Sequence, residues 1–225
     1  MHTGTGQVVE LILEDGGQLA RISCGANLIP SPGQYLLLGN TSDSPIPVPV
    51  FYTDSAPQGF IAAPLGANPW SPGQEVYLRG PLGRGFEMPL SARKVALIAF
   101  DTPPARLHGL IKPALKQAAA VVLVCDFVSD RLPDQVEVQP LSALADILNW
   151  ADTIAIDVAR ENLQRLEERL GTSNQLPALR AAQVLVRTLM PCGGIADCGV
   201  CAVQLKSVWR LACKDGPVLD WRELG

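Results

Sequence analysis

The strongest constraint on the fold is a change in the apolar pattern near residue 90. Beyond Pro89, two almost continuous apolar runs, at 94–100 and 121–125, match strands that are buried on both faces of a sheet. A stretch with helical character, 105–119, separates them. Further strands are expected at 136–138, 153–156 and 182–187, and further helices at 143–150 and 162–170. This alternation predicts a parallel sheet flanked by helices.

The residues before about position 90 have a different apolar pattern, in which short apolar runs are separated by glycine and proline. A turn at 15–17 joins the runs 8–13 and 19–24 as a probable hairpin. Four more short strands are expected at 33–38, 48–53, 59–63 and 75–79. Six short strands separated by turns predict a small antiparallel β-barrel.

Four of the six cysteines lie within 22 residues near the C-terminus: Cys192, Cys198, Cys201 and Cys213. The first three are spaced C-x5-C-x2-C, in a segment whose glycines permit the positive φ angles of a tight loop. Thiols this close, in a chain with no evident secretion signal, are expected to bind metal. The spacing is one residue longer in its first gap than the plant-type two-iron pattern, whereas zinc sites usually show two C-x2-C pairs. The segment therefore predicts a [2Fe-2S] cluster, with a four-cysteine zinc site as the alternative.

Composition limits the remaining possibilities. The 225 residues are 48 % hydrophobic and 18 % charged with a formal charge of −4, which indicates a globular protein and argues against a nucleic-acid partner. The longest apolar run, 118–125, is too short to cross a bilayer, so no membrane association is expected. These features predict a protein of a reducing compartment, most simply the cytoplasm. Cys24 and Cys125 lie in apolar strand runs and are expected to be core residues.

The order of barrel, α/β unit and cysteine segment resembles the electron-transfer subunits of dihydroorotate dehydrogenases, which are ferredoxin-reductase-like iron–sulfur flavoproteins of pyrimidine biosynthesis. The likeness extends over essentially the whole chain, and its most specific parts are PGQY at 32–35, GPLGRGF at 80–86 and MPCG at 190–193. It implies an FAD-binding-type barrel (1–90), a degenerate nucleotide-binding-type α/β domain (91–188) and a cluster-binding segment (189–225). It also implies a hetero-oligomer with a flavin-bearing catalytic subunit.

In this family a motif of the form Arg-x-aromatic-Ser/Thr holds FAD, and the matching residues here are VFYT at 50–53. The resemblance assigns Tyr52 to stack on the flavin and Thr53 to hydrogen-bond it, although both could be ordinary strand residues. Val50 stands where the family has an arginine for the pyrophosphate, so a charge-assisted contact is missing. Three glycines of the domain junction are assigned to the same possible FAD: Gly80, Gly83 and Gly85.

The nicotinamide motifs of the family are also altered. Where a glycine-rich turn would let the backbone approach a dinucleotide, residues 101–106 read DTPPAR, with two prolines and no glycine. The later Cys-Gly-Pro motif is replaced by IDVAR at 156–160. Both losses argue against NAD(P) binding. Asp101, Arg106 and His108 could form a new site, but they are expected to be a solvated turn and helix face.

The sequence therefore predicts an electron-transfer subunit, not catalytic alone, in which the cluster relays electrons to or from a flavin. That flavin would be an FAD near Tyr52 and 80–85 or one on the partner subunit, and a second redox protein, such as a ferredoxin, would be the other partner. Two alternatives remain open. One is a complete FAD- and NAD(P)H-dependent reductase with altered motifs, and the other is a non-catalytic subunit with a structural cluster.

Overall fold

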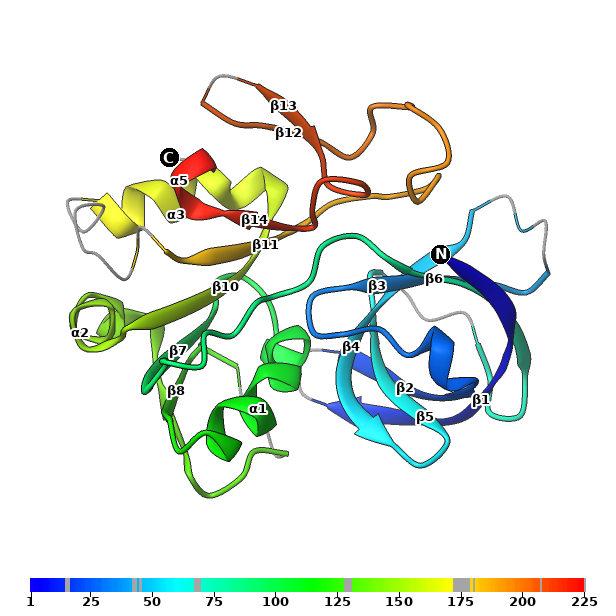
Figure 1. Cartoon of the computed structure of the whole chain (residues 1–225), viewed down its shortest axis with the longest axis horizontal. Coiled ribbons are helices and arrows are strands. Elements are labelled where there is room, and N and C mark those ends of the chain that lie inside the picture. Colours follow the sequence, from blue (N-terminus) through cyan, green and yellow to red (C-terminus); the bar gives the residue numbers. More distant parts are fainter. Residues whose placement is uncertain are drawn as a thin grey trace.

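The N-terminal part of the chain forms a closed antiparallel barrel (Figure 1). The computed structural model describes residues 1–14, 17–41, 44, 46–66, 70–127, 131–171, 179, 181–206 and 208–224. The barrel strands are β1 (His2–Glu14), β2 (Gly17–Cys24), β3 (Tyr35–Gly39), β4 (Val48–Ala56), β5 (Gly59–Pro64) and β6 (Glu75–Leu82). They follow one another around the barrel in the order β1-β2-β5-β4-β3-β6. The six predicted strands and the β1–β2 hairpin are confirmed.

Alternation of side chains explains how these short strands close on a core. Residues two apart in one strand point to the same side of the sheet, so Leu36 and Leu38 of β3 both enter the interior. There they pack against Phe60 of β5 and Leu78 of β6. Pairing of β1 with β6 completes the ring, and a 3-10 helix, Ala26–Leu28, follows β2 in the chain and packs against β1 and β6.

The second unit is a six-stranded sheet in the order β14-β11-β10-β7-β8-β9. Its strands are β7 (Lys94–Ala99), β8 (Ala120–Val124), β9 (Val136–Gln139), β10 (Thr153–Ala159), β11 (Gln183–Arg187) and β14 (Val218–Asp220). The first five pair in parallel, as the alternating pattern predicts. The edge strand β14 is antiparallel to β11 and was not predicted, so part of the segment 189–225 belongs to this sheet.

Helices cover both faces of the sheet, because β7 and β8 present apolar side chains alternately to each face. One face carries a 3-10 helix η2 (Pro104–Leu110) and helix α1 (Ile111–Lys116), and the other carries α2 (Leu144–Trp150) and α3 (Leu163–Leu170). Shorter helical turns are η3 (Leu141–Ala143), η4 (Arg160–Asn162) and the C-terminal α5 (Trp221–Leu224). The single helix expected over 105–119 is therefore divided, and no described helix is long and apolar enough to cross a membrane.

The barrel, the sheet and the cysteine segment share one continuous core. Tyr35 and Phe51 of the barrel belong to the same buried cluster as Ile98 of β7 and Val218 of β14. The C-terminal segment, orange to red in Figure 1, leaves the sheet after β11 and returns to it through β14. Between them lies a small hairpin of β12 (Ala202–Gln204) and β13 (Trp209–Leu211). This path brings the cysteines beside the barrel.

Candidate metal centre

The β12–β13 hairpin brings together two of the four predicted ligands. Cys201 directly precedes β12, and Cys213 is the second residue after β13. Pairing of the two strands therefore brings these cysteines close together in space. The Ala212 N–H donates to the Cys201 carbonyl at 3.1 Å, which extends the hairpin to the cysteines. The two Sγ atoms lie 3.2 Å apart, and both residues are buried.

A glycine-rich loop brings together the other two. Cys192 and Cys198 have Sγ atoms 3.6 Å apart, with Cys192 half-buried and Cys198 exposed. Gly193, Gly194 and Gly199 adopt φ angles of 51°, 82° and 72°, in the left-handed region that glycine permits. All six cysteines of the chain are free thiols. The predicted ligands therefore converge as two pairs at one end of the molecule.

The pairs influence each other electrostatically. Burial raises the pKa of Cys213 to about 12, and the thiols of Cys201 and Cys192 add to the rise. For Cys192, burial acts in the same direction, but hydrogen bonds with the backbone at Ala196 and Gly194 and with the thiols of Cys198 and Cys213 together outweigh it and bring the pKa to about 7. Four neighbouring thiolates are unfavourable without a cation, because like charges would meet in a partly buried site. A bound metal would remove that penalty, since metal binding displaces thiol protons.

The separation of the sulfurs within each pair can be compared with that of two thiolates on one metal ion. Two thiolates on one tetrahedral ion at about 2.3 Å lie roughly 3.8 Å apart, close to the 3.6 Å of Cys192–Cys198 and somewhat longer than the 3.2 Å of Cys201–Cys213. Among the described residues, no group of three or more His, Cys, Asp or Glu side chains is arranged to hold a metal ion. The four cysteines thus form two close pairs of sulfurs, and the described residues show no assembled metal site.

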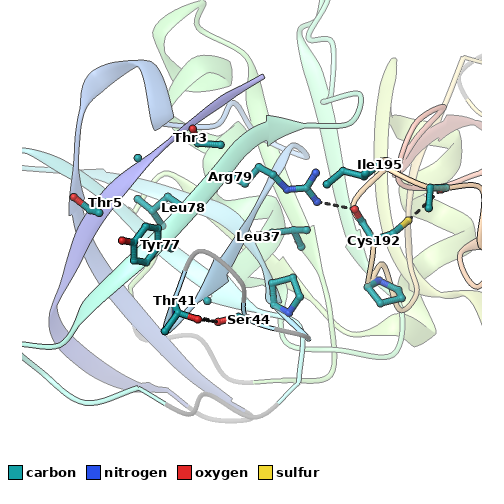
Figure 2. A pocket seen from close by; sticks show the side chains of 15 residues that line it. Thr3, Thr5, Leu37, Thr41, Ser44, Tyr77, Leu78, Arg79, Cys192 and Ile195 are labelled. Carbon is teal, nitrogen blue, oxygen red and sulfur yellow. Dashed lines mark hydrogen bonds between the residues drawn. The ribbon is translucent and has the colours of Figure 1, made fainter.

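The barrel holds this site through two side chains that the sequence did not single out as functional. The Tyr35 hydroxyl donates to the Cys213 carbonyl at 3.1 Å. Arg79 Nη2 donates to the Cys192 carbonyl at 2.6 Å (Figure 2). Tyr35 belongs to the PGQY sequence used for the family resemblance, but nothing linked it to the cysteines. Arg79 carries no sequence signal, because its partner is 113 residues away.

The three glycines assigned to FAD serve internal packing instead. A Cβ at Gly83 would lie 2.5 Å from the Gly216 carbonyl oxygen, and one at Gly85 would lie 2.7 Å from the Pro32 carbonyl oxygen. At Gly80, with φ of 151°, a Cβ would overlap Leu36. Each glycine therefore allows protein backbone or side chains to approach closely.

Tyr52 and Thr53 do not present a flavin site either. The Tyr52 ring stacks on Phe60 at 6.2 Å between centroids, and a Cβ added to Gly109 of η2 would lie 2.7 Å from the ring. The buried Thr53 Oγ1 makes no hydrogen bond, but the cavity beside it is about 110 Å³. Ligand pockets usually measure about 300 Å³ or more, so this space suits water better than a flavin ring. The residues assigned to FAD therefore do not fit that group.

The edge of the sheet where α/β folds bind dinucleotides is occupied by a buried charge network. Asp157, at the end of β10, accepts from Arg106 Nε and from Arg187 Nε, both at 2.8 Å. Asp101 accepts from Arg187 and from the Ala159 N–H, and Asp157 is fully buried. The expectation of a solvated turn is thus wrong for Arg106, which is 7 % exposed, and for the half-buried Asp101.

This network leaves little room for a dinucleotide. Arg106 also donates to Thr102, which places a side chain across the turn that would face the phosphates. The adjoining cavity, walled by Arg106 and Arg187, is about 220 Å³. Asp157 was not recognised from the sequence, since it lies inside an apolar strand and its two partners are distant in the chain.

The chain resembles known proteins in its structure and not in its sequence. No family model and no curated protein matches the sequence. The structure is similar to a chain of NADH-dependent reduced ferredoxin-NADP oxidoreductase, a structure described for flavin-based electron bifurcation, with 15 % identity, a TM-score of 0.76 and coverage of 100 % of this chain and 91 % of that one.

Two further structures support the same assignment. A ferredoxin reductase of carbazole 1,9a-dioxygenase gives a TM-score of 0.62 at 17 % identity, with coverage of 75 % of this chain and 65 % of that one. Ferredoxin NADP+ reductase from Neisseria gonorrhoeae, solved with bound FAD and NADP, gives a TM-score of 0.55 at 11 % identity, with coverage of 83 % of this chain and 98 % of that one. The chain therefore has the ferredoxin-NADP reductase-like fold of a β-barrel joined to a parallel-sheet α/β domain.

Proposed function

We propose that the chain is the electron-transfer subunit of an oxidoreductase and carries a [2Fe-2S] cluster on Cys192, Cys198, Cys201 and Cys213. The observation that carries the proposal is the convergence of these thiols as two pairs, with Sγ separations of 3.6 and 3.2 Å. When bound, such a cluster accepts and releases single electrons. The fold supports an oxidoreductase role by likeness to reductase structures.

Two of the proposed ligands are buried in the protein core, and one is exposed to solvent. Cys201 and Cys213 are buried against the core, and Tyr35 holds the backbone there. Cys198 is exposed, and the loop around it also exposes apolar side chains, with Ile195 70 % and Val200 41 % accessible. Exposed apolar groups beside an exposed ligand favour docking of a partner at this end, where the distance for electron transfer would be shortest.

The flavin of the relay is proposed to lie on that partner. Tyr52 is covered by η2, and the junction glycines pack against protein, so these residues favour a flavin that is held elsewhere. By the sequence resemblance, the partner would be a flavin-bearing subunit like the catalytic subunit of dihydroorotate dehydrogenase. The charge network at the sheet edge favours another redox protein, and not NAD(P), as the second partner.

Two other functions are distinguishable from this one. A complete FAD- and NADP-dependent reductase is favoured by the bound cofactors of the Neisseria structure, and it would show flavin absorption that NADH or NADPH bleaches. A subunit with a structural zinc ion is favoured only by the four cysteines, and it would be colourless and redox-inactive. An anaerobic visible spectrum, recorded before and after NADH and then dithionite, separates the three.

Substitution of one ligand tests the site itself. Cys198→Ser removes an exposed thiol, so it should abolish or strongly reduce iron and acid-labile sulfide content with little effect on the fold. Cys125→Ser is the matched control, because Cys125 follows β8 within the α/β core and lies apart from the paired thiols. Full iron content in Cys198→Ser would contradict the assignment of this ligand.

A further inference from the structure

Arg79 joins the barrel to the cysteine loop at a cavity of about 570 Å³ (Figure 2). The cavity lies between strands β1, β3 and β6 and the loop residues 191–196. Arg79 Nη2 donates to the Cys192 carbonyl at 2.6 Å across this boundary. The approach is tight, because a Cβ at the next residue, Gly193, would lie 2.5 Å from the same nitrogen. The loop is therefore built to bring Cys192 against Arg79.

The charge of Arg79 is not balanced locally. Within the part of the chain that the structure describes, no carboxylate lies within ion-pair distance of its guanidinium, whereas Lys214, the neighbour of Cys213, is bonded to Asp197 at 2.5 Å. Arg79 is also half-buried, so solvent screens it less than a surface lysine. Its guanidinium is thus held at the backbone of Cys192, a member of the Cys192–Cys198 pair.

Tyr35 makes the corresponding contact with the other pair. Its hydroxyl is buried and donates to the Cys213 carbonyl, and burial, together with the nearby thiols, raises its pKa so that it remains a neutral donor. Each pair of sulfurs therefore has one ligand whose backbone is held by a barrel side chain. The difference is that Arg79 adds a charge to this contact and Tyr35 does not.

We propose that Arg79 is a positioning residue that fixes Cys192 and raises the reduction potential of the cluster. This inference rests on the proposed function, because it presupposes a cluster on these four cysteines. Reduction adds one electron and breaks no bond, so its free energy depends on how well the added negative charge is stabilised. A cation held at the backbone of one ligand stabilises the reduced form and favours reduction.

The test is a redox titration of anaerobically purified protein with dithionite, followed by electron paramagnetic resonance. Arg79→Gln removes the charge and keeps a hydrogen-bond donor, whereas Arg79→Lys keeps the charge. Arg21→Gln is the matched control, since Arg21 lies on β2 and pairs with Glu10 at 3.0 Å. Iron and sulfide are measured for every variant, so that a shift in potential is read only from loaded protein.

We expect Arg79→Gln to be harder to reduce, with the ratio of reduced to oxidised cluster about tenfold lower at a fixed potential, a shift of about 59 mV for one electron. Arg79→Lys should recover most of this shift, and Arg21→Gln should behave as wild type. A wild-type midpoint in fully loaded Arg79→Gln would overturn the proposal.

If Arg79→Gln does not retain iron, the iron content and midpoint potential of Arg79→Lys test the proposal instead. A loaded lysine variant with a midpoint near that of wild type supports the role of the charge, whereas a folded lysine variant that also lacks iron overturns it. Wild-type protein without iron and sulfide overturns the proposed function and this inference together. The two failures are therefore distinguishable.

Discussion

At the scale of single residues, function and packing compete for the same side chains. Tyr52 matches a flavin-stacking position by sequence, yet its ring is used to pack η2 against the barrel. Tyr35 and Arg79 were not identified as functional, yet they hold the backbone of two cysteines. Spacing along the chain reveals the cysteines because they are close in sequence. It cannot reveal Arg79, whose role depends on a contact between β6 and a loop more than a hundred residues later.

A half-buried histidine gives a residue-scale prediction about pH. His108 is held largely neutral, because burial lowers its pKa from 6.5 to about 4, with Arg131 acting in the same direction and Asp54 against it. Glu14 and Lys112 line the same cavity. Since the unfolded chain takes up the proton more readily than the folded one, stability should fall as pH drops from 6.5 towards 4 and be unaffected above 6.5. The full effect is at most about 3 kcal/mol.

Urea unfolding of wild type and His108→Gln between pH 4.5 and 7.5 measures this contribution. The difference between the two free energies of unfolding should change across the interval below pH 6.5 and remain constant above it. Because all other groups are common to both proteins, a difference that is flat over the whole range would contradict a neutral, half-buried His108.

At the scale of elements, the regular strands were predictable and the irregular connections were not. The buried runs of β7 and β8 and the alternating runs of the barrel have the period of strands, so sequence alone indicates them. Strand β14 has three residues after a proline, too few for a period to show. The expected helix at 105–119 is broken into η2 and α1, in a stretch that contains Gly109 and Pro113, which both weaken an α-helix.

The loop between Cys192 and Cys198 gives an element-scale prediction. In Gly193→Ala the new methyl group would overlap Leu37 and crowd Arg79, in addition to the strain of φ at 51°. Gly199→Ala is the matched control, because it has φ of 72° but no neighbouring atom within 4 Å. Both changes should cost about 1 kcal/mol of backbone strain, and only Gly193→Ala should lose roughly 1–3 kcal/mol more from overpacking.

Equilibrium unfolding and iron content of the two variants check this. Gly193→Ala should be the less stable and should retain less iron, because its loop can no longer dock on the barrel. Equal stability and equal iron content would show that contact between the loop and the barrel does not matter for the site.

At the scale of the whole molecule, the chain has a reductase-like fold, and the residues that the resemblance assigns to cofactors make contacts within the protein. Helix η2 packs on Tyr52, and the Arg106–Asp157–Arg187 network lies at the carboxyl end of the parallel strands. The fold was predictable from the order of elements. The contacts of Arg106, Asp157 and Arg187 were not, since they depend on side chains that meet only after folding. The loop that carries the exposed Cys198 is accessible, as a relay between partner proteins would require.

The central claim is that this chain carries a two-iron cluster and relies on a flavin elsewhere. Its most direct test is the content of iron, acid-labile sulfide and flavin in anaerobically purified protein. The account predicts about two iron atoms and two sulfides per chain, with flavin far below one per chain. One zinc ion per chain, or stoichiometric FAD without iron, would contradict it.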